Sequence, residues 1–144
     1  MIEDGLRVDV NCFVRLYRDG KLKEYREIHN TVTTAGKEGV ADQILAGPSL
    51  AKMGWMAIGT GTPSGTLLGA EISRVAFTSK TRSGAVITVV GDWAAGVGTG
   101  ALTEAGTFDV VTANTVNMWM SATFAVVNKT AADTLQITWT LTVG

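Results

Sequence analysis

The chain has 144 residues, a length that corresponds to one domain and suffices for a self-standing hydrophobic core. Its formal net charge of −1 offers no basic surface for nucleic acid or an anionic membrane. No apolar run approaches the roughly 20 residues of a membrane helix. The single cysteine, Cys12, excludes an internal disulfide and a cysteine-based zinc site.

The N-terminal part of the chain is rich in charge and is predicted to form a β-hairpin. Residues 1–42 hold 7 basic and 8 acidic side chains, against 5 and 5 in the rest of the chain. The start, MIEDGLRVDVN, has no apolar stretch of the kind a signal peptide needs, so we expect synthesis in the cytoplasm of the cell that makes the protein. Apolar residues alternate with polar ones before a strong turn signal at Asp19-Gly20, and Cys12, which belongs to this alternation, is interpreted as a small core residue. We expect a single domain over 1–144, with a hairpin arm over 1–29 and a body over 30–144.

The segment NTVTTAGKEGVADQILAGP is expected to contain one short helix, over about residues 35–46. Thr33 or Thr34 can cap its N-terminus, and Gly47-Pro48 would end it. Its apolar residues fall on one side: Val40, Ile44 and Leu45. We expect this helix to close one end of the sheets.

After Met53 the chain alternates between strand and turn signals. TRSG is interpreted as a turn. Six further strands are predicted, in WMAIGTGT, EISRVAFTS, AVITVVGDWA, ALTEAGTFDVV, VNMWMSATFAVV and LQITWTLTV. Together with the hairpin they make about eight strands, which is typical of a mainly β protein with an antiparallel β-sandwich or jelly-roll fold.

The last predicted strand has one apolar face and one face without charge. The apolar residues from Leu135 to Val143 alternate with uncharged polar residues: Gln136, Thr138, Thr140 and Thr142. A strand face in bulk water usually carries some Lys or Glu, so we expect this face to contact protein. The alternative is that Thr is simply a good strand former on an exposed face.

Three tryptophans are candidates for an interface. Trp55 and Trp93 lie near predicted turns, where they can anchor a partner. Trp119 lies on a strand whose two faces are both apolar, which indicates that the strand is covered on both sides. Packing in the core or at the ends of the sheets is the alternative interpretation for these residues.

The sequence contains no motif that indicates catalysis, a cofactor or a metal. His29 is the only histidine and is expected on the surface. GTGTPSG at 59–65 lacks the Lys-Ser/Thr pair of a phosphate loop, and GVGTG at 96–100 does not complete GxGxxG. We interpret both as strand connections and expect that the protein is not an enzyme.

Charged residues are rare in the predicted β body. Arg74 and Glu104 are expected to form a structural ion pair across the sheet. Glu71 lies three positions before Arg74, an odd spacing that would place the two on opposite faces of a regular strand.

An ordered series of motifs resembles a family of small virion proteins of tailed bacteriophages: AIGTGT, LLGAEISR, LTEAGTFD, MWMSATF and NKTAADTLQITWTLT. The resemblance covers roughly residues 30–144 and includes NTVTTAG. Members are described as tail-fibre-like or head-decoration proteins. The resemblance therefore implies a β-sandwich or jelly-roll module that binds and assembles on a phage particle, often as a trimer. The hairpin departs from the simplest members and is a candidate attachment element.

Two binding functions follow from the resemblance. The first is a capsid decoration, or cement, protein that binds the major capsid protein in many copies and stabilises the head shell as a homotrimer. The alternative is a tail-fibre or baseplate module that recognises a host surface, with Trp55 and Trp93 as candidate sugar contacts. The chain has no repeated shaft, which favours decoration. We expect a location in the virion and no nucleic-acid or membrane partner.

Overall fold

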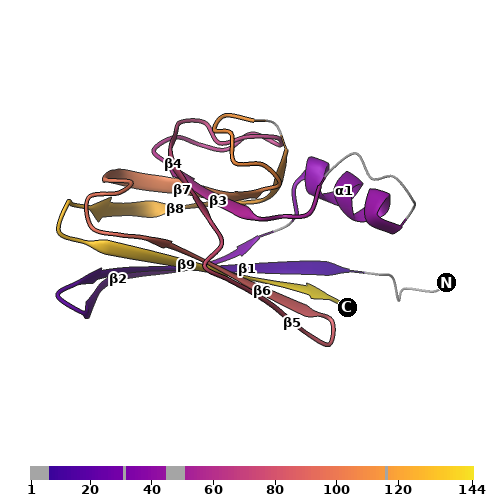
Figure 1. The fold of residues 1–144 in the computed structure, drawn as a ribbon, viewed down its shortest axis with the longest axis horizontal. Helices are drawn as coiled ribbons and strands as arrows, with labels where there is room; N and C mark the ends of the chain where they lie inside the picture. Colours follow the sequence, from indigo (N-terminus) through magenta and orange to yellow (C-terminus); the bar gives the residue numbers. More distant parts are fainter. Residues whose placement is uncertain (1–6, 31, 45–50, 116) are drawn as a thin grey trace.

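The computed structural model describes residues 7–30, 32–44, 51–115 and 117–144, which form a β-sandwich of nine strands and one helix (Figure 1). One sheet has the strand order β2-β1-β9-β6-β5 and the other β4-β3-β7-β8, with all neighbours antiparallel. The predicted mainly β sandwich is confirmed. The strands are β1 (Val8–Arg18), β2 (Lys21–Asn30), β3 (Trp55–Gly59), β4 (Glu71–Ala76), β5 (Ser79–Ser83), β6 (Val86–Trp93), β7 (Gly100–Phe108), β8 (Met118–Lys129) and β9 (Thr134–Val143).

The main core lies between the two sheets. Strand β9 contributes side chains that are at most 4% exposed, from Leu135 to Leu141 at every second position. Strand β1 contributes Cys12 among its buried residues, which confirms the prediction of a core position. Burial raises the pKa of the Cys12 thiol far above its ordinary value, so the thiol stays protonated and unreactive.

The N-terminal hairpin is an integral part of the five-stranded sheet. Asp19 and Gly20 both have positive φ, 51° and 73°, as a tight two-residue hairpin turn requires. Strand β1 pairs with β9 over ten residues, and the Arg26 side chain of β2 donates to the backbone oxygens of Ala125 and Val126 in β8 at 3.2 and 2.8 Å. The hairpin is thus paired with the C-terminal strand, and the inward side chains of β1 join the common core.

Helix α1 (Thr34–Ile44) lies at one end of the sandwich, as expected (Figure 1). The Thr33 hydroxyl is the N-cap: it accepts a hydrogen bond from the N–H of Gly36 at 2.9 Å. A Cβ on Gly36 would lie 2.1 Å from the backbone oxygen of Trp119, so only glycine allows the helix to approach β8 this closely. Leu45 and the predicted stop at Gly47-Pro48 lie outside the described residues.

Strand β5 occupies a segment for which the sequence predicts a turn. Thr81–Ser83 of TRSG belong to this edge strand, and the chain turns at Gly84, where φ is 57°. All five residues of β5 are exposed, because the five-stranded sheet is wider than the sheet that covers it. A strand that buries no side chain has no apolar alternation, so the pattern could not reveal it.

Other segments of the chain cover the outer face of the four-stranded sheet but not that of the five-stranded sheet. Over the four-stranded sheet, the segments that follow β3 and β7 fold back (Figure 1), and Leu68 packs there with Ala57, Phe108 and Met118. Over the five-stranded sheet, no segment among the described residues folds back in this way (Figure 1). The first face is a small second core, and the second is open.

The turn between β8 and β9 is fixed by a buried carboxylate. Asp133 accepts hydrogen bonds from Arg18 Nε at 2.8 Å and from the backbone N–H of Thr130 at 2.8 Å. The hydrogen bond from Arg18, followed by that from the Thr130 backbone, holds the pKa of Asp133 well below its usual range. The carboxylate therefore positions the start of β9 in its charged form.

We predict that this carboxylate contributes to the loss of stability in acid. A depressed pKa adds stability above the unfolded-state pKa, and this stability is lost as pH falls below about 4. The variant Asp133→Asn should be less stable than the wild type at pH 7, and its stability should fall less steeply in acid. Urea unfolding at a series of pH values measures both effects. Parallel pH profiles for the two proteins would contradict this role.

Candidate binding surface

The strongest candidate site is the outer face of the five-stranded sheet. Its three central strands, β1, β9 and β6, place outward side chains in rows that cross the sheet. In one row Phe13, Thr138 and Val90 are neighbours, and in the next row Asn11, Thr140 and Thr88 are neighbours. Thr142 and Val86 continue the pattern in a third row. We call these eight residues the neutral strip.

The neutral strip carries no charge and is only partly open to solvent. Each of its side chains is half-buried, because neighbours on adjacent strands cover one another. The predicted site residues Thr138, Thr140 and Thr142 are thus brought together with uncharged side chains from β1 and β6. A surface of this composition has little desolvation cost when it is covered, since no ion loses its water.

Charged side chains border the strip: Asp9 lies beside Thr142 in the third row, Glu27 lies beside Phe13, and one further row carries two charges. Gln136 stands between Arg15 on β1 and Asp92 on β6. Its amide donates to Asp92 Oδ1 at 3.2 Å, and the hydroxyl of Thr78 donates to Asp92 Oδ2 at 2.6 Å. The Arg15 guanidinium lies 5.2 Å from the centre of the Tyr25 ring, within the range of a cation–π contact. This row presents a cation and an anion on opposite sides of β9.

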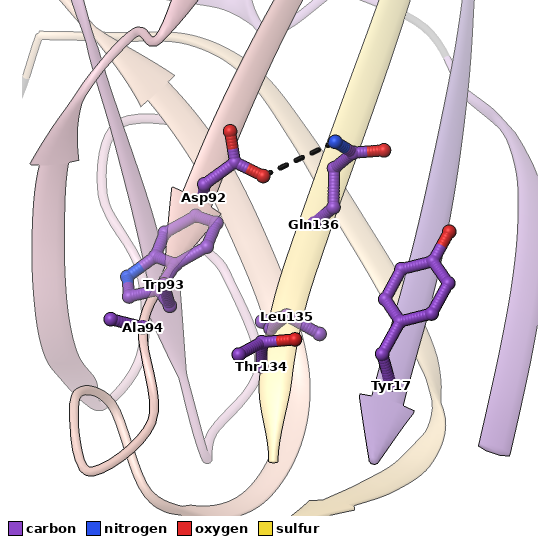
Figure 2. Close-up of a pocket in the computed structure, with 7 residues that line it drawn as sticks. All are labelled: Tyr17, Asp92, Trp93, Ala94, Thr134, Leu135 and Gln136. Atoms are coloured by element: carbon purple, nitrogen blue, oxygen red, sulfur yellow. Dashed lines mark hydrogen bonds between the residues drawn. The ribbon is translucent and has the colours of Figure 1, made fainter. Parts of the chain in front are cut away.

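A pocket of about 390 Å³ opens at the end of the face that lies beyond this row (Figure 2). Figure 2 shows Tyr17 from β1 on one side of β9, and on the other side Asp92 and Trp93 from β6 and Ala94, which follows β6. Its lining combines an aromatic ring with the polar groups of Asp92, Gln136 and Thr134, as pockets for polar ligands do. Trp93 contributes little accessible surface, because it is 1% exposed.

None of the three predicted interface tryptophans belongs to the neutral strip. Trp93 and Trp119 are 1% and 5% exposed and belong to the main core, so their prediction as interface anchors is wrong. The indole N–H of Trp119 donates to the backbone oxygen of Ala51 at 3.1 Å. Trp55 is half-buried against the small core on the outer face of the four-stranded sheet. The alternative of core or sheet-end packing describes all three.

The predicted ion pair between Arg74 and Glu104 is also wrong. Arg74 instead forms a bidentate pair with Glu71, at 2.9 and 2.7 Å, and its guanidinium lies 3.7 Å from the centre of the Phe108 ring. The reason is a β-bulge: Ser73 pairs with Ile58, but the next residue of β3, Gly59, pairs with Glu71. The extra residue, Ile72, turns Glu71 and Arg74 to the same face despite their odd spacing.

Glu104 binds backbone groups and not a cation. Its carboxylate is fully buried and accepts hydrogen bonds from the N–H groups of Gly61, Gly69 and Ala70, at 2.8, 2.7 and 2.8 Å. These donors lie in the segment between β3 and β4, which contains the predicted connection at 59–65. The carboxylate therefore has a structural role, in which it fixes this segment over the sheet.

Neither a metal centre nor a membrane-spanning helix is found among the described residues. No group of three or more His, Cys, Asp or Glu residues in this part of the chain is arranged to hold a metal ion. Among the same residues, no helix has the length and hydrophobicity to cross a membrane. His29 lies on the surface, as expected, with its side chain 75% exposed. It contacts Asn11 and Glu27, and neither residue supplies the hydroxyl or thiol nucleophile of a catalytic triad.

Comparisons with known proteins identify no relative: the chain matches no protein-family model, no curated protein and no solved structure. The resemblance to virion proteins of tailed phages therefore remains a prediction from the motifs.

Sequence reasoning identified the residues that β9 contributes to this face and missed those from its neighbours. Phe13, Val90, Arg15 and Asp92 belong to other strands, and only the pairing register brings them beside Gln136 and Thr138. Strand alternation was the available signal, since each of these residues faces away from the core side of its own strand. No pattern in the sequence indicated the order of the strands in the sheet.

We predict that the Arg74–Glu71 pair is essential to the outer layer of the four-stranded sheet. Both side chains are at most 3% exposed, so Arg74→Ala leaves a buried carboxylate without its partner. This should lower the free energy of unfolding by about 3–5 kcal/mol. Arg82→Ala, at an exposed position of β5, is the matched control and should change it by less than about 0.5 kcal/mol. Equal unfolding midpoints for the two variants would contradict the assignment.

Proposed function

We propose that this chain is a structural protein of a tailed-bacteriophage particle and acts by binding protein, without catalysis. The single observation that carries the proposal is the open, uncharged outer face of the five-stranded sheet. Protein interfaces are depleted of charge at their centre and polar at their rim, and the neutral strip with its bordering charges has this arrangement. The motif series that resembles phage virion proteins supplies the setting.

The proposed role is capsid decoration. A decoration protein binds the head shell in many copies through contact with the major capsid protein, and it must remain folded outside a cell. Three features of the described structure suit that requirement: a core that includes the unreactive Cys12, a hairpin paired with the C-terminal strand, and buried carboxylates that fix the loops. The resemblance supports assembly as a homotrimer on the particle.

The alternative role is a tail-fibre or baseplate module that recognises a host surface. The pocket at the end of the sheet supports it, because an aromatic ring beside carboxylate and amide groups is suited to a sugar (Figure 2). The contacts would be Tyr17, Asp92 and Gln136, and not the predicted Trp93, which is buried. This role uses only the pocket and gives no reason for the open neutral strip. Decoration therefore accounts for more of the observed features.

The copy number of this chain in purified phage particles tests the proposal. Quantitative mass spectrometry would compare the chain with the major capsid protein in the same sample. Decoration predicts a ratio comparable to that of the capsid protein. A small fraction of that ratio would favour the tail-associated role, and absence from the particle would overturn the proposal.

A further inference from the structure

The charges that border the neutral strip make the outer face complementary to itself. Arg15 and Asp92 stand in the same row, one strand to either side of β9. Among the described residues, neither side chain forms an ion pair. The cation lies on one half of the face and the anion on the other, at equal distance from the central strand.

A twofold axis that runs parallel to β9, above the face, exchanges these two halves. It brings the β1 side of one copy over the β6 side of the other and leaves the rows in register. Arg15 of each copy then lies opposite Asp92 of the second copy, which gives two symmetric charge pairs. We propose that the outer face of the five-stranded sheet binds the same face of a second copy of this chain in this arrangement.

The rest of the face is compatible with the same axis. Phe13 lies opposite Val90 of the second copy, and Asn11 lies opposite Thr88, so uncharged groups meet across the strip. On the outer strands, Glu27 of β2 lies opposite Ser79 of β5. In the third row Asp9 lies opposite Val86, and among the described residues of these rows no two like charges are placed opposite each other.

Other ways of placing the two faces pair the charges differently. A twofold axis that lies between the two faces and runs perpendicular to the strands places β1 of one copy over β1 of the other. If it passes through the row of Gln136, it sets Arg15 opposite Arg15 and Asp92 opposite Asp92. If it passes through the row of Thr138, Arg15 lies opposite Asn11, and neither charge is paired. If it passes midway between the rows of Thr138 and Thr140, Arg15 lies opposite Asp9, but Asp92 lies opposite Val86. Only the axis along β9 pairs Arg15 with Asp92, so charge exchange at position 92 separates these two arrangements.

The size of the face is adequate for a dimer. Five strands about 4.8 Å apart, each up to about ten residues long, give an area on the order of 700 Å² per copy. A standard protein interface buries about 800 Å² per partner. Two sheets packed face to face at about 10 Å would bury the neutral strip, as the layers of a sandwich do.

This inference adds a partner to the proposed function and rests on it only in treating the face as a protein contact. A twofold contact is compatible with the trimer that the resemblance implies, since dihedral assemblies combine twofold and threefold axes. The test uses the purified chain alone, so its outcome is independent of the copy number in particles.

Charge exchange at the two positions tests the pairing. Sedimentation equilibrium would measure self-association of the wild type, Arg15→Asp, Asp92→Arg and the double variant with both changes. Each single variant sets like charges opposite each other and should weaken the association by about tenfold or more. The double variant restores opposite charges and should recover most of the loss. Arg82→Asp, on the other side of β5, is the matched control and should associate like the wild type.

Three results would overturn the proposal. The first is a wild type that stays monomeric at high micromolar concentration. The second is a set of single variants that associate as tightly as the wild type. The third is a double variant no better than the single ones, with thermal unfolding showing that all variants are folded. The face-to-face pairing is supported if both single variants associate more weakly than the wild type and the double variant regains the association.

Discussion

The fold depends on the position of its last strand, β9, at the centre of the five-stranded sheet. One edge of β9 pairs with β1 over ten residues, and the other edge pairs with β6 over eight. Its inward side chains, including the fully buried Trp139, form the middle of the core, and its outward ones form the middle of the candidate interface. The sheet is incomplete until the C-terminal strand has paired with the N-terminal hairpin. A topology of such long-range pairing predicts slow folding and a cooperative body that includes both ends of the chain.

The charged residues that stabilise the fold are different from those that border the candidate interface. The buried carboxylates each have a defined local partner: Glu104 holds three backbone N–H groups, Glu71 holds Arg74, and Asp133 holds Arg18. The outer face of the five-stranded sheet keeps its charges at the border, where Arg15 and Asp92 stand on opposite halves. Buried ions without partners would destabilise the fold, whereas ions within the neutral strip would oppose its burial by a partner.

The parts of this account that the sequence predicts are those encoded in short-range patterns. The alternation in LQITWTLTV identified both faces of β9, Asp19-Gly20 located the hairpin turn, and the Thr33 cap located the helix. The errors arise where one residue changes a pattern or where burial is decided far away in the chain. The bulge at Ile72 reversed the expected partners of Arg74, and β5 buries nothing that could mark it as a strand. Only the part of the candidate interface that lies on β9 was predicted. The sequence does not reveal strand order and register, which bring Phe13 and Asp92 beside β9.

The most direct test of the central claim is the recovery of a Thr138→Lys, Thr140→Lys double variant in the native assembly, measured by quantitative mass spectrometry. Two lysines in the neutral strip would have to be desolvated on contact with protein, but they stay hydrated on a free sheet. The variant with Thr123→Lys and Ala125→Lys, two exposed positions of β8, adds the same charge elsewhere. If the face is an interface, both variants keep the wild-type thermal unfolding, and only the first is lost from the assembly. Full retention of the first variant would contradict the account and would mean that its threonines are simply strand formers facing water.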